Sequence, residues 1–447
     1  MAKAAPPGLR RRKACAGAVQ PDGARFAVRP MMTKRELRNG ARLLMEPIDH
    51  VRSASVGLWL EVGSRHEPPE WSGACHFIEH MLFKGAAHHT ALQLADAMNR
   101  LGGHFNAFTS QEALCLHARL IDNQLSEGLE LLAEMLLTST FPEEELQRER
   151  NVILEEYKMI EDTPDDLVID LFHEALWGQD PVGRPVIGRL QTIASLSRPT
   201  LRAFLDQELN PSQLIIAVAG ALDEKSVEDQ VQRLFGDLPA QAPARRPSPR
   251  PHGAFQTQVR QKDMEQVQFC FGCLGPARVD EDRYRFSLLS AIVGGGMSSR
   301  VFKEVREKRG LAYSIGSYLT AFRDTGGFAI SGGTSPERLA QVVELCVEEI
   351  RSLYREGVRG DELDLAKEQL KTSLLFALES TGARMTRLAE QEIYHGRFLE
   401  VDEILREIDA VSAADIRRVA EARLRNAPVA IAAVAPPQAA SIQLETF

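Results

Sequence analysis

Two histidines and one glutamate are spaced so that they could act together on a metal ion. His76, Glu79 and His80 follow the order His-x-x-Glu-His. On a helix, residues i and i+4 lie on one face, so the two imidazoles can converge on one ion. Glu79 would project beside that ion, where its carboxylate could polarise a bound water. The pattern predicts a catalytic zinc site on a helix, and a third ligand must come from elsewhere in the chain.

The third ligand is expected among the carboxylates of a second helix. Residues 143–157 are strong helix formers, and no helix breaker follows Pro142. Glu149 and Glu156 are two helical turns apart and share one face, whereas Glu155 points about 100° away from Glu156. One carboxylate of such a pair could bind the metal while the other orients the ligand or the water. Periodicity alone also fits a solvated acidic helix surface.

These segments resemble those of a known family. The signature of the pitrilysin/insulinase zinc peptidases, the inverzincins, is similar to the segment His76-Phe-Ile-Glu-His-Met-Leu-Phe-Lys-Gly85. The chain most resembles the single-unit branch, which includes the mitochondrial processing peptidase and its bacterial homologues. The similarity extends from about Thr33 to beyond residue 420, over several separate motifs.

The resemblance implies a role for each candidate residue. The family's third zinc ligand lies in a segment similar to Glu149-Arg-Asn-Val-Ile-Leu-Glu-Glu156, so Glu156 is expected to bind zinc and Glu149 to act as an auxiliary acid. His76 and His80 would be the other ligands, and Glu79 would be the general base. One Zn²⁺ per chain is expected, because the second half of the sequence has no His-x-x-Glu-His segment.

A further pair of candidate residues lies in the second half of the chain. Arg306 and Tyr313 are part of the segment 302–314. A guanidinium and a phenol can both donate to a peptide carbonyl and stabilise developing negative charge. The residues alone fit a basic helix end that runs into a strand better than they fit a site. The family resemblance implies instead that the two side chains reach across the zinc cleft and hold the substrate backbone.

The predicted activity is hydrolysis of peptide bonds by a zinc metalloendopeptidase with an enclosed chamber. Residues 102–112 resemble an edge strand of the family's active-site cleft, so extended peptides are expected to add a strand near Phe105–Thr109. The net charge is −9, with acids concentrated in residues 143–166, which favours basic peptides if those acids face the cavity.

Three alternatives stand beside this prediction. A dedicated targeting-peptide or precursor-processing peptidase would use the same chemistry on a narrower set of substrates. A catalytically silent scaffold subunit is a second alternative, although such relatives typically lose metal ligands. The third treats the histidine motif as a coincidence on a buried helix of an unrelated binding protein.

Bulk composition is that of a globular protein. The 447 residues are 44% hydrophobic and 26% charged, and they suggest about two to three domains. No apolar run approaches the ~18 residues that span a bilayer, and no nucleic-acid partner is expected. Cys270 and Cys273 lie in a strand pattern, are expected to face opposite sides, and should remain reduced. The predicted location is cytoplasmic, or an organellar matrix if residues 1–30 act as a transit peptide.

The chain is organised as a diverged duplication. Strand patterns at 55–62 and 267–274 each precede a helix pattern, and each half continues with further strands and a helix. The predicted fold is of the α+β type, with two repeats that each have a mainly antiparallel sheet and helices packed on one face. The family resemblance implies that the two repeats form half of a clam shell, and that two chains pair as a homodimer or with a related chain. The predicted segments are a basic extension (1–30), a zinc-binding catalytic domain (31–237), a Pro/Arg-rich linker (238–258) and a C-terminal repeat without a metal site (259–447).

Overall fold

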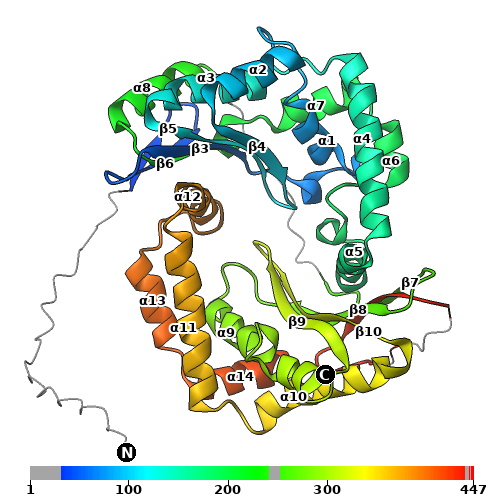
Figure 1. Cartoon of the computed structure of the whole chain (residues 1–447). Helices are drawn as coiled ribbons and strands as arrows, with labels where there is room; N and C mark the ends of the chain where they lie inside the picture. The colour runs from blue at the N-terminus through cyan, green and yellow to red at the C-terminus, as the bar shows by residue number, and fades with distance from the viewer. Residues whose placement is uncertain (1–31, 241–251, 438–441, 443) are drawn as a thin grey trace, which may run out of the picture.

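Two β-sheets form the frame of the chain (Figure 1). The computed structural model describes residues 32–240, 252–437, 442 and 444–447. Within these ranges the first sheet consists, in spatial order, of β1 (Thr33–Glu36), β2 (Arg42–Pro47), β6 (Leu214–Gly220), β3 (Ser53–Leu60), β5 (Leu114–Ile121) and β4 (His104–Thr109). The second consists of β7 (Thr257–Gln261), β11 (Ala430–Ala435), β8 (Val267–Gly275), β10 (Gly326–Thr334) and β9 (Ala312–Ala321).

The strands pair as the sequence predicts. Only β2 with β6 and β7 with β11 are parallel among the described strands, and the remaining neighbours are antiparallel. The predicted α+β fold with mainly antiparallel sheets is confirmed. Strand β4 is an edge of the first sheet, so one side of its backbone is available for pairing with another chain.

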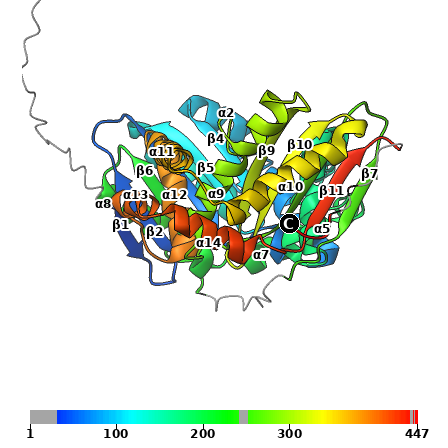
Figure 2. The ribbon, with the colours of Figure 1, turned by 90° about the horizontal axis from the view of Figure 1, so that it is seen from below.

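Most helices pack against the sheet of their own half. The first half has α1 (Ala74–Met81), α2 (Ala91–Leu101), α3 (Leu125–Leu137), α4 (Glu143–Asp162), α6 (Leu190–Ser195), α7 (Arg198–Glu208) and α8 (Glu224–Phe235). The second half has α9 (Arg283–Gly294), α10 (Leu339–Arg355), α11 (Gly360–Ala377), α13 (Val401–Asp409) and α14 (Ala413–Arg423). Figure 2 shows α10 and α14 in contact across the lower side of the molecule.

Short helical turns connect these elements. They are η1 (Ser64–His66), η2 (Pro69–Trp71), η3 (Asp122–Gln124), η4 (Pro181–Gly183), η5 (Pro211–Gln213), the π-helical η6 (Phe302–Glu307) and η7 (Pro336–Arg338).

Two helices are exchanged between the halves, which the sequence analysis did not predict. Helix α5 (Pro164–Trp177) follows α4 but packs on β8 and β11 of the second sheet. Helix α12 (Thr381–His395) belongs to the second half but packs on β2, β3 and β6 of the first sheet (Figure 1). Each sheet is therefore covered on its second face by a helix from the other half of the chain.

The contact between α12 and the first sheet predicts a stability effect. Met385 of α12 is buried, and Trp59 of β3 donates its indole N–H to the sulfur at 3.3 Å. A Cβ added at Gly57 would lie 2.5 Å from that sulfur, so the contact is close. We expect Met385→Ala to lower the free energy of unfolding by about 2–5 kcal/mol, through lost burial and the cavity that remains.

Urea unfolding monitored by tryptophan fluorescence measures this change. Met297→Ala is the matched control, because Met297 is 78% exposed and its loss should change stability little. Equal free energies of unfolding for Met385→Ala and Met297→Ala would contradict the packing of α12 on the first sheet.

The other sequence predictions have mixed outcomes. Cys270 and Cys273 are buried on opposite faces of β8, as expected. Residues 257–258, assigned to the linker, belong to β7 instead, because this edge strand pairs with β11. Residues 1–30 and 241–251 lie outside the described residues, and the division into domains stays a prediction. Among the described residues, no helix combines the length and apolar character needed to cross a bilayer.

Candidate metal centre

Helix α1 presents the histidine motif because its other face is buried. Phe77, Ile78 and Met81 are each no more than 1% exposed and pack into the core of the first half. The helix begins after Gly73, whose φ of 94° is left-handed. A Cβ at this position would lie 2.6 Å from the carbonyl oxygen of Ile187, so only glycine fits. The remaining face carries His76, Glu79 and His80.

The start of α1 is fixed by a buried carboxylate that the sequence analysis missed. Glu67 accepts hydrogen bonds from the amides of Gly73 at 2.8 Å and Cys75 at 2.7 Å. Burial raises the pKa of Glu67 to about 7, while the two amide donors and the charge of Arg184 oppose the rise. Glu67 therefore fixes the start of α1, the helix that carries the histidine motif.

The raised pKa of Glu67 predicts a pH-dependent stability. The folded protein holds this proton up to about pH 7, whereas the unfolded chain releases it near pH 4.5. Between these values the folded state binds more protons, so the free energy of unfolding falls as pH rises, by about 3 kcal/mol. Glu67→Gln cannot titrate and should lack this fall. Urea unfolding of the zinc-free protein at pH 5 and pH 7.5 measures it.

The exposed Glu70 supplies the control, because Glu70→Gln should keep the pH dependence of the wild type. If Glu67→Gln and the wild type lost the same free energy of unfolding between the two pH values, Glu67 would not be the responsible group.

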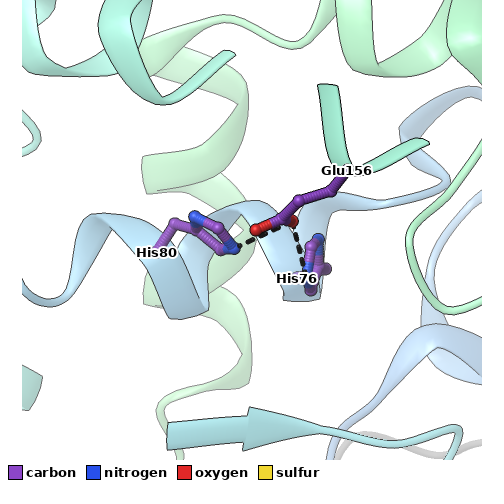
Figure 3. A group of neighbouring side chains, drawn as sticks. All are labelled: His76, His80 and Glu156. Atoms are coloured by element: carbon purple, nitrogen blue, oxygen red, sulfur yellow. Dashed lines mark ion pairs between the residues drawn. The ribbon is translucent and has the colours of Figure 1, made fainter. Parts of the chain in front are cut away.

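The side chains of α1 and α4 converge at one point (Figure 3). The Oε2 atom of Glu156 lies 3.8 Å from Nε2 of His76 and 3.5 Å from Nε2 of His80. All three ligand atoms lie within 4.8 Å of one another, a spacing that one Zn²⁺ can bridge after small side-chain rotations. Burial and the neighbouring His80 lower the pKa of His76 to about 4, so its imidazole is neutral, the form that binds metals. Two imidazoles and a carboxylate are the donor set of a catalytic zinc.

Glu149 and Lys84 hold His80 in place. The buried carboxylate of Glu149 accepts from Nδ1 of His80 at 3.0 Å, and Nζ of Lys84 lies 2.8 Å from its other oxygen. A carboxylate only accepts, so Nδ1 carries a proton, and Nε2, on the side of Glu156, is the nitrogen that could bind a metal. The sequence analysis gave Lys84 no role.

Glu79 is fixed by the edge strand. The hydroxyl and the amide of Thr109, the last residue of β4, hydrogen-bond to its half-buried carboxylate. Burial raises the pKa of Glu79 and the nearby Glu156 adds to the rise, while the bonds from Thr109 and the charge of His80 oppose it. Sequence reasoning placed Thr109 in the edge strand but gave it no role toward Glu79.

Arg306 and Tyr313 lie apart from this group. Arg306 belongs to η6 and Tyr313 to β9, and the guanidinium carbon lies 4.8 Å from the centre of the Tyr313 ring. Tyr313 is 79% exposed. Among the described residues, no hydrogen bond or ion pair joins either side chain to His76, His80 or Glu156. Their role in holding substrate stays a prediction.

Comparisons with known proteins agree with the fold and with the family resemblance. The model of the insulinase family, peptidase family M16, matches residues 42–189, and the peptidase M16 inactive domain matches residues 195–370. The chain is 38% identical over 406 residues to the uncharacterized zinc protease YmxG of Bacillus subtilis, covering 91% of this chain and 98% of that protein.

Two solved structures share the fold. The structure of a peptidase M16 inactive domain from Pseudomonas fluorescens has a TM-score of 0.85 at 22% identity, covering 93% of this chain and all of that chain. A protease from Helicobacter pylori has a TM-score of 0.84 at 23% identity, covering 91% of this chain and all of that chain.

The two-sheet fold thus places the chain among proteins built on the peptidase M16 architecture. The chain belongs to the insulinase family, peptidase family M16, as its match to the family model and its identity to YmxG over nearly the full length of both proteins show.

Proposed function

We propose that this chain is a zinc-dependent metalloendopeptidase. The observation that carries the proposal is the convergence of His76, His80 and Glu156 on one point, beside Glu79 on the same face of α1. YmxG, which is named a zinc protease, supports the same chemistry. The family match alone does not decide catalysis, because its second part is described as an inactive domain.

The proposed mechanism assigns a task to each side chain. His76, His80 and Glu156 would hold one Zn²⁺, which would supply a Lewis acid and an acidified water when bound. Glu79 accepts the proton of the attacking water and passes it to the leaving amine. Glu149 keeps His80 oriented, and Thr109 keeps Glu79 oriented. Both tasks reduce the motion needed during the reaction.

The proposed substrates are extended peptides. A peptide that pairs with the free edge of β4 would be held by main-chain hydrogen bonds, which demand little of its sequence. Arg306 and Tyr313 would bind the same backbone if the second half approaches it.

A preference for basic peptides has less support. Several acids of the 143–166 cluster already pair with cations: Glu145 with Arg148, Glu155 with Lys158 at 2.7 Å, Glu161 with Arg260 at 2.9 Å and Asp162 with Lys262 at 3.5 Å. These pairs reduce the negative potential that the cluster can offer to a substrate.

The remaining predictions about context stay predictions. They are the pairing of two chains, the cytoplasmic or organellar location, and a narrower role in processing targeting peptides. The silent-scaffold alternative is disfavoured, because the three-ligand donor set and Glu79 are all present.

Metal removal tests the proposal. The chain is incubated with a zinc chelator, assayed on a mixture of quenched-fluorescent peptides, and assayed again after one equivalent of Zn²⁺ is restored. We expect cleavage to vanish with the metal and to return with it. Cleavage that persists in the zinc-free protein, or none with stoichiometric zinc bound, would exclude a self-sufficient zinc peptidase.

A further inference from the structure

The turn that follows β4 is built around a buried carboxylate. Glu112 is 6% exposed and lies three residues after Thr109, in the turn between β4 and β5. Its carboxylate accepts from Nη1 of Arg65 at 2.6 Å and from the backbone amide of Arg323 at 3.1 and 3.2 Å. The hydroxyl of Tyr394, in α12, also hydrogen-bonds to it. One carboxylate therefore joins three distant segments of the chain.

The same turn is clamped from the first half. The amides of Ser64 and Arg65 donate to the carbonyls of Ser110 at 3.1 Å and Gln111 at 3.0 Å. A Cβ at Gly63 would lie 2.2 Å from the carbonyl oxygen of Ser110, so the two backbones touch. The turn has little room to shift on this side.

The second half completes the clamp. Arg323 and Asp324 form the tip of the hairpin between β9 and β10. The guanidinium of Arg65 binds Asp324 through two hydrogen bonds of 2.9 Å while it also binds Glu112. The two acids and the arginine form a network in which the arginine spans the halves, and such a paired network fixes geometry closely.

The turn directly follows Thr109, the residue that contacts the proposed catalytic base Glu79. The amide and the hydroxyl of Thr109 hydrogen-bond to Glu79, and the same hydroxyl lies 3.4 Å from the carbonyl oxygen of Cys75. A displacement of the turn would therefore move Thr109 and release Glu79. A displacement of about 1 Å at a catalytic group can reduce the rate about 100-fold.

We propose that Glu112 is a positioning residue through which the second half of the chain sets the place of Glu79. Its effect on catalysis rests on the proposed peptidase function. The hairpin tip lies within residues 195–370, so the part of the chain that matches an inactive domain acts on the catalytic base through a contact that involves no metal ligand. Glu112 acts through Thr109, and does not touch the reacting atoms.

A double-mutant cycle tests whether Glu112 acts on Glu79 through Thr109. Glu112→Ala is expected to lower kcat by about 10- to 100-fold with zinc content unchanged, and Thr109→Val to lower it by a similar factor. Because both act through one contact, the double variant should be no slower than the slower single variant. If the two substitutions acted independently, their fold-reductions in kcat would multiply in the double variant. Glu112→Gln, which keeps the shape of the side chain, replaces Glu112→Ala if the latter does not fold.

Glu46→Ala is the matched control. Glu46 is a buried carboxylate that pairs with Arg384 of α12, but it lies on β2, which β6, β3 and β5 separate from β4. Loss of Glu46 removes a similar contact between the halves far from Glu79. We expect this variant to retain kcat within about threefold, whatever its stability.

Amide hydrogen exchange gives a readout that does not depend on activity. In Glu112→Ala, the amides of β4 should exchange at least 10-fold faster than in Glu46→Ala. Unchanged exchange in β4, or multiplicative kcat losses in the cycle, would overturn the proposal. If the wild type cleaves no peptide, the proposed function fails, and the exchange rates still decide whether Glu112 positions β4.

Discussion

Glu79→Gln is expected to lower kcat for peptide hydrolysis by about 10²- to 10⁴-fold while zinc remains bound, the range typical of a lost general base. Glutamine keeps the shape of the side chain but cannot accept the proton of the attacking water. Thr109 can still hydrogen-bond to the amide oxygen at this position, so the variant should fold normally. The substitution therefore isolates proton transfer from metal binding.

The measurement compares the rates at which the wild type and Glu79→Gln, loaded with equal zinc, cleave a mixture of quenched-fluorescent peptides. Zinc content is determined on the same samples, so that a loss of metal is not read as a loss of the base. Equal cleavage by the two proteins would reject Glu79 as the base. An inactive wild type with bound zinc would point to a missing partner chain or to a scaffold role.

Glu156→Gln is expected to weaken zinc binding by more than about 100-fold. Its Oε2 atom lies 3.5 Å from Nε2 of His80 and 3.8 Å from Nε2 of His76, and a neutral amide oxygen is a much poorer ligand. Loss of a group that only orients a ligand typically costs 10- to 100-fold, so loss of a ligand should exceed that range.

Competition against a chromophoric chelator measures the zinc dissociation constant. Glu155→Gln is a matched control one residue away, since Glu155 is exposed and pairs with Lys158 at 2.7 Å. It carries the same change in charge on the same helix, and we expect its zinc affinity to stay within about threefold of the wild type. Equal weakening in both variants would mean that net charge, not ligation, sets the affinity.

The parts of the site that can be predicted are those encoded by local spacing. His76, Glu79 and His80 share one turn of one helix, so the i, i+4 period is enough to place them together. Glu156 lies far along the chain from them, and periodicity restricts it only to a face of α4; the family resemblance was needed to choose it.

Thr109, Glu112 and Lys84 could not be assigned roles from the sequence. Each acts through a contact that forms only when elements distant in the chain meet. Glu112, for example, meets Arg323 only after the hairpin of the second half docks on the first.

In the fold, too, local patterns could be predicted and contacts between distant elements could not. Alternating and apolar patterns predicted several elements, such as the strands near 55–62 and 267–274, because burial on one face follows directly from residue type. The exchange of α5 and α12 was not predicted, although the sequence held one signal. Strands β6 and β11 consist of apolar residues and glycine, and the structure buries every position of both. Strands that are apolar throughout need cover on both faces, and the pattern does not say which helix supplies it.

The exchanged helices set the timing of folding during synthesis. Strand β6 completes the first sheet at Gly220, but α12, which covers that sheet, begins only at Thr381. At about 5–20 residues per second, the ribosome needs roughly 10–30 s to make the intervening chain. Throughout that interval Leu44, Trp59 and Ile215 lack the helix that later buries them. The nascent chain thus exposes the apolar face of the first sheet for roughly 10–30 s, the interval in which it is most open to aggregation.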